Sequence, residues 1–132
     1  MVRTPLGVRE HVDVLAERVM GAAIEVHRHL GPGLVESVYL AAMEHELLAR
    51  GIAYESDVHL PLWYKGATLD GTLHMDLIIE REVAVALKSL DIVLPMHCAP
   101  LLTYLKVGDY RRGLLINFNV ATLMSGVRRF SR

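Results

Sequence analysis

Asp76 and Lys88 are the two side chains whose types and spacing most favour joint chemistry in this sequence. Both lie in the stretch 73–90, LHMDLIIEREVAVALKSL, and Glu36 supplies a further carboxylate that a helix could bring to the same place. Carboxylates that converge near a lysine can hold Mg²⁺ and polarise a phosphodiester. The same spacing also suits a surface or half-buried ion pair, which is the commoner arrangement and has little energetic value.

The stretch that carries Asp76 and Lys88 reads as two short strands joined by a tight turn at 80–82. In that register Ile79 pairs with Val83, Asp76 with Ala86, and His74 with Lys88. Because side chains alternate across a strand, one face of the hairpin is expected to be wholly apolar. That face carries Met75, Leu77, Ile79, Val83, Val85 and Leu87. The opposite face carries His74, Asp76, Ile78, Ala84, Ala86 and Lys88.

Helical periodicity surrounds this hairpin. Apolar residues at steps of three and four predict helices over 8–30, 34–50 and 97–107, the last with Pro100 in its first turn. The Gly-Pro-Gly corner at 31–33 separates the first two helices, and Gly51 is expected to end the second. Strand patterns cover 52–60, 62–64, 112–118 and 127–130.

Length and composition predict one domain, 1–132, with a flexible N-terminus over residues 1–9. The element order predicts an α/β fold with a mixed sheet and a parallel strand–helix–strand crossover. Hydrophobic residues make up 52% of the chain. No apolar run reaches the roughly 18 residues of a membrane span, so we expect no membrane partner. The high apolar share suggests burial of surface against another copy or a partner, and we expect self-association.

Charge and cysteine content narrow the remaining classes. The formal net charge of -1 argues against a broadly basic nucleic-acid surface. Short basic clusters could still contact phosphate, although a solvated face or a subunit contact fits them equally. Their candidate members are Arg111, Arg112, Arg128 and Arg129. The lone Cys98 and the absence of an apolar leader in MVRTPLGVREHVD favour a cytoplasmic location.

Several motifs in order carry a family resemblance. The segment 33–39, GLVESVY, is a GxxExxY heptad that follows AAIEVHRHLGP, and YKG occurs at 64–66. LLTYL at 101–105 and GLLINFNV at 113–120 follow the hairpin. Together these motifs resemble the GxxExxY proteins of the PD-(D/E)XK nuclease superfamily, over about residues 10 to 130. The resemblance implies a restriction-endonuclease-like mixed sheet flanked by helices, with an N-terminal helical pair.

The resemblance also implies roles for the charged residues. Asp76 matches the first metal-binding carboxylate of the superfamily pattern, Lys88 matches its water-positioning lysine, and Glu36 matches the helix glutamate. An active member would be a phosphodiesterase dependent on Mg²⁺ or Mn²⁺. Asp76 and Glu36 are therefore the candidate ligands for weak metal binding.

Two positions depart from the family pattern. The expected Glu-x-Lys reads Ala86-Leu87-Lys88, and Pro100 stands where a helix glutamine is expected. Glu82, about 13 Å from Ala86 along the strand, and Asp91, beyond the strand end, are not convincing replacements. We therefore expect a degenerate active site, lost hydrolysis and a homo-oligomeric assembly or interaction module. The alternative is a Mg²⁺-dependent nuclease, or a nucleic-acid-binding protein, with a weakened site.

Overall fold

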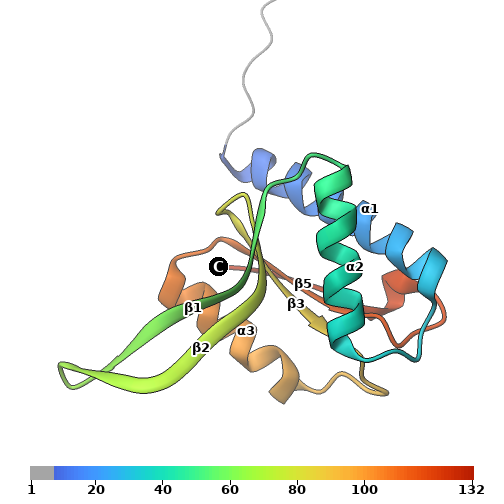
Figure 1. Ribbon diagram of the computed structural model, residues 1–132. Coiled ribbons are helices and arrows are strands. Elements are labelled where there is room, and N and C mark those ends of the chain that lie inside the picture. The colour runs from blue at the N-terminus through green and yellow to red at the C-terminus, as the bar shows by residue number, and fades with distance from the viewer. Residues whose placement is uncertain (1–7) are drawn as a thin grey trace, which may run out of the picture.

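A five-stranded mixed sheet forms the centre of the structure, in the order β1-β2-β3-β4-β5 (Figure 1). The computed structural model describes residues 8–132, and the side chains of residues 10–69 and 73–132. Only β3 and β4 run parallel; the other neighbouring strands are antiparallel. The elements are α1 (Val8–Leu30), α2 (Glu36–Ala49), β1 (Tyr54–Tyr64), β2 (Ala67–Ile79), β3 (Val83–Lys88), α3 (Pro95–Gly108), β4 (Arg112–Asn117), η1 (Leu123–Gly126) and β5 (Val127–Ser131).

This architecture confirms the predicted α/β class and the parallel crossover partners. Of the predicted flexible N-terminus, residues 1–7 lie outside the described residues, and residues 8 and 9 already belong to α1. The two strands predicted over 52–60 and 62–64 form one strand, β1, with a register shift at Pro61. Because proline cannot donate to a ladder, it is tolerated there on the edge strand.

The corner between α1 and α2 is held by one tyrosine. Gly31 has φ of 66° and Gly33 has φ of 98°, so the chain reverses through the conformation that glycine adopts without strain. The hydroxyl of Tyr39 donates to the carbonyl of Gly31 at 2.6 Å, and its ring stacks on Phe118 with centroids 4.4 Å apart. The α2 helix is thereby fixed to the end of β4.

Apolar clusters cover both faces of the sheet, with α1 and α2 on one face and α3 on the other (Figure 1). The first cluster takes alternate residues of the central strands: Leu77, Ile79, Val83, Val85, Leu87, Leu114 and Ile116. The second takes the intervening residues and the inner side of α3: Met75, Ile78, Ala84, Ala86, Leu101, Tyr104, Leu105 and Leu115. Ile78, Ala84 and Ala86, which the sequence places together on the second face of the hairpin, are thus buried on the α3 side.

Met75 lies on the face opposite to the predicted one, because the first hairpin is irregular. The register of β1 and β2 pairs Ser56 with Leu77 and Val58 with Met75, passing over Asp57 and Asp76. Asp57 has a left-handed φ of 50°, a conformation that bends and twists a strand. Side-chain alternation along β2 changes face between Leu77 and Met75, and Met75, 3% exposed, packs in the α3-side cluster.

The turn between β2 and β3 is confirmed. Glu80 and Arg81 have φ of 48° and 61°, and the N–H of Glu82 donates to the carbonyl of Ile79 at 2.9 Å. Two successive left-handed residues match the twist of a tight hairpin. The predicted pair of Ile79 with Val83 forms, and the paired register ends at Leu77 and Val85, before the other two predicted pairs.

Two glycines provide a steric test of this fold. A Cβ on Gly126 would lie 2.1 Å from the backbone oxygen of Asn117, whereas one on Gly21 would meet only the Arg50 guanidinium at 3.4 Å. We expect Gly126→Ala to destabilise the protein by about 2 kcal/mol or more, because backbone must move. Gly21→Ala, within α1, should be neutral or stabilising by up to about 1 kcal/mol. Urea unfolding of both variants measures this, and equal stabilities would contradict the packing at η1.

Candidate functional site

Asp76 occupies the point where β2 and β3 separate. Its half-buried carboxylate accepts a hydrogen bond through Oδ2 from the backbone N–H of Leu87, at 2.7 Å. In a regular antiparallel ladder this N–H would bond to a main-chain carbonyl. The side chain of Asp76 thus completes the backbone pairing where the strand ladder stops.

Ala86 stands where the family resemblance predicts the second carboxylate. It is 6% exposed and packs in the α3-side cluster with Met75, Ile78 and Leu101. The surroundings of position 86, where the family resemblance predicts a metal ligand, are apolar in this chain. Lys88 is the last residue of β3 and is half-buried, and none of the ion pairs in the described part of the chain joins it to Asp76.

Glu36 lies at the start of α2 and lines a groove of about 620 Å³ beside the end of β3. Asp91 lines the same groove, where its Oδ1 accepts a hydrogen bond from Asn119 Nδ2 at 3.0 Å. Ser89 closes one side by donating its hydroxyl to the carbonyl of Leu34 at 2.5 Å. The structure thus places Glu36 beside a groove with Asp91, and Asp76 is not among the described lining residues.

An unpredicted polar cluster lies on the first hairpin. Asp57 Oδ1 is 3.2 Å from both His59 Nε2 and His74 Nδ1, and the two imidazoles stack with centroids 5.3 Å apart. The hydrogen bond from His59 lowers the pKa of the Asp57 carboxyl. His59 and His74 are partners across the β1–β2 register, which the sequence did not fix. In the described part of the chain, no group of three or more His, Cys, Asp or Glu side chains is arranged to hold a metal ion.

Pro100 lies inside α3, and its predicted place in the first turn was wrong because the helix begins at Pro95. The N–H of Leu94 donates to Nδ1 of His97 at 2.8 Å. This bond caps the first turn of α3, which begins two residues before the predicted start at residue 97. Pro100 is exposed, while Leu101 and Tyr104 are buried against the sheet. Burial raises the pKa of the Tyr104 hydroxyl to about 12, so this group stays protonated near neutral pH.

The four candidate arginines lie on β4, on β5 and just before β4. Arg112 Nε donates to Asp13 at 2.7 Å and Arg129 Nη2 donates to Glu17 at 2.8 Å, so both connect the sheet to α1. Arg111 and Arg128 are exposed. Arg112 pairs in register with Val83, at the end of β3 remote from Lys88. The structure therefore does not bring the Arg111–Arg112 pair to the Glu36 groove.

The α/β fold with its mixed sheet agrees with a comparison against family models. Residues 13–130 match the model described as the PD-(D/E)XK nuclease superfamily. The chain belongs to this superfamily. No curated protein and no solved structure matches it.

Membership in the PD-(D/E)XK superfamily establishes the predicted restriction-endonuclease-like α/β fold. As a separate finding, no helix in the described residues is both long and apolar enough to cross a membrane.

The Asp76 carboxylate is expected to contribute stability through its backbone bond. Asp76→Ala leaves the N–H of Leu87 without this acceptor, at a cost of about 1–3 kcal/mol. Asp76→Asn keeps an amide oxygen at the same place and should cost about 1 kcal/mol or less. Chemical denaturation at neutral pH distinguishes the two variants. Equal losses would show that the bond to Leu87 has no stabilising role.

Proposed function

We propose that this PD-(D/E)XK domain does not hydrolyse phosphodiesters and serves as a homo-oligomeric assembly module. Two observations together support the loss of hydrolysis: the Asp76 carboxylate is hydrogen-bonded to the backbone, and Ala86 is buried. One oxygen of the Asp76 carboxylate accepts the Leu87 N–H, and Ala86 supplies no ligand in place of the expected glutamate. Mg²⁺ prefers six oxygen ligands in near-octahedral geometry. A single carboxylate that already accepts a backbone hydrogen bond supplies few of them.

Exposed apolar side chains at the end of the β1–β2 hairpin support the assembly role. Trp63 is 67% exposed, Tyr64 is 59% exposed and Leu69 is 43% exposed. Figure 1 shows this end of the hairpin extending beyond the helices. We take a second copy of the chain as the occupant, since the net charge of -1 offers little repulsion between copies and a two-fold contact can be self-complementary.

The assembly proposal predicts a concentration-dependent mass. Light scattering of the unmodified protein should give a dimer or larger species, and the double variant Trp63→Thr with Tyr64→Thr should shift it to the monomer. Leu48→Gln is the matched control, because Leu48 is 72% exposed on α2, away from the hairpin. A monomer at all working concentrations, or equal effects of both changes, would reject self-association through the hairpin.

A weakened nuclease or nucleic-acid-binding protein is the second candidate. It is favoured by the groove in which Glu36 and Asp91 approach the end of β3, next to Lys88. In this alternative, Glu36 and Asp76 would hold Mg²⁺ or Mn²⁺ weakly, and Lys88 would position the attacking water. We further propose that the chain is a GxxExxY protein. Glu36 is the central residue of that heptad, so this assignment favours a role for Glu36 in the groove.

Cleavage assays separate the two candidates. We expect no cutting of plasmid or RNA in Mg²⁺ or Mn²⁺, and cutting only after the paired reversal Ala86→Glu with Pro100→Gln. The reversal restores both missing polar groups, while either single change restores one. Cleavage by the unmodified protein that Glu36→Gln and Asp76→Asn both abolish would overturn the inactive assignment. Glu36 is exposed, so its variant also guards against a folding artefact.

A further inference from the structure

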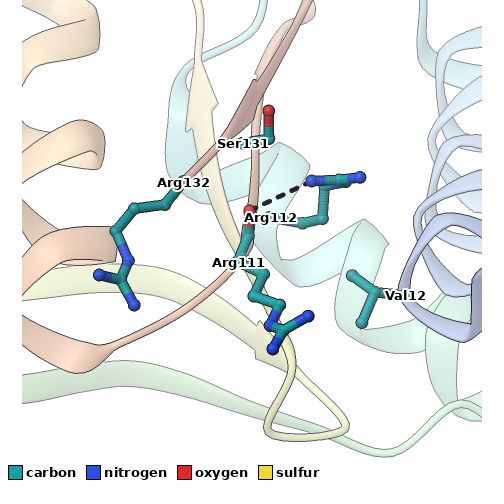
Figure 2. A pocket seen from close by; sticks show the side chains of 5 residues that line it. All are labelled: Val12, Arg111, Arg112, Ser131 and Arg132. Atoms are coloured by element: carbon teal, nitrogen blue, oxygen red, sulfur yellow. Dashed lines mark hydrogen bonds between the residues drawn. The ribbon is translucent and has the colours of Figure 1, made fainter. Parts of the chain in front are cut away.

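Three arginines line a pocket at the end of the sheet opposite the Glu36 groove (Figure 2). The pocket encloses about 260 Å³, and its lining residues are Val12, Arg111, Arg112, Ser131 and Arg132. Arg112 pairs with Val83 on β3 and with Ser131 on β5, whereas Lys88 pairs with Asn117. The length of the parallel strands, roughly 16 Å, therefore separates this pocket from the nuclease-type site.

Existing contacts fix two of the guanidinium groups. Arg112 Nε donates to Asp13 at 2.7 Å, and its Nη1 donates to the carbonyl of Arg111 at 3.4 Å. Arg132 pairs with Asp109 and donates through Nε to the carbonyl of Tyr110 at 3.4 Å. Each guanidinium carries five N–H donors, so these bonds hold the planes in place and leave further donors for a ligand.

Arg111 is the third arginine that lines the pocket. Its side chain is exposed, and none of the ion pairs in the described residues includes it. Figure 2 shows its side chain between Arg132 on one side and Val12 of α1 on the other, with Arg112 above it. The other two arginines of the pocket have carboxylate partners, Asp13 for Arg112 and Asp109 for Arg132.

We infer that this pocket binds a phosphate group. Arginine forks match phosphate oxygens with paired, charge-assisted hydrogen bonds, and guanidinium groups already oriented by other contacts lose little entropy on binding. The Arg112 side chain is only 18% exposed, so its interaction with an anion is less screened than at an open surface. The backbone N–H of Arg132 donates to the carbonyl of Arg111 at 2.9 Å, and this bond joins the two chain segments that carry these arginines.

The phosphate can belong to a small molecule or to a nucleic-acid chain, and the two sources share the same chemistry. Titration calorimetry with inorganic phosphate, a 5′-phosphorylated oligonucleotide and its unphosphorylated counterpart distinguishes them. Binding of the first two alone assigns a terminal or free phosphate. Equal binding of both oligonucleotides assigns the nucleic-acid backbone. Absence of binding by all three at low salt would overturn the inference.

Matched arginine variants test the location. Arg111→Gln should weaken phosphate binding by about tenfold, the loss expected for one charge-assisted contact. Arg128→Gln removes the same charge from an exposed arginine on β5 that is not among the pocket residues, and should change binding less than about twofold. Equal losses in the two variants would show unspecific charge attraction and reject the pocket.

Discussion

The hydrogen bond from the Leu87 N–H to the Asp76 carboxylate is the interaction on which the middle of the sheet depends. It lies where three irregularities meet: the left-handed φ of Asp57, the shift of faces at Met75, and the end of the β2–β3 ladder. An unpaired N–H at such a place would cost free energy comparable to a lost hydrogen bond. The carboxylate satisfies it while allowing the strands to separate. A residue suited to metal chemistry therefore has a structural role that needs no metal.

Local patterns explain which parts of the fold could be predicted. The Glu80–Arg81 turn and the Ile79–Val83 pair follow from a few adjacent residues, and the helices follow from their periodicity. Met75 was misplaced because β2 departs from strict alternation between Met75 and Leu77, beside Asp57 and Asp76, which the β1–β2 register passes over. The apolar pattern of β2 contains no sign of this irregularity.

The candidate site shows the same division. Ala86 could be placed on one face with Ala84 because both stand in the same strand, where side chains alternate. Asp91 could not be placed, since it follows the strand and its direction depends on Asn119, which comes from beyond β4. Likewise His59 and His74 meet only through the register of β1 with β2. Contacts made by distant segments were the unpredictable part.

The β3 strand is buried on both faces, and a small apolar residue such as Ala86 fits this environment. Residues Val83 to Leu87 are all buried, so a glutamate at position 86 would place a carboxylate among the apolar side chains under α3. Without a cation or a donor, burying that charge is costly. With the Asp76 carboxylate bonded to the backbone, alanine removes this cost and lets α3 pack directly on the strand. Ala86 thus stabilises the core through the packing of α3 on β3.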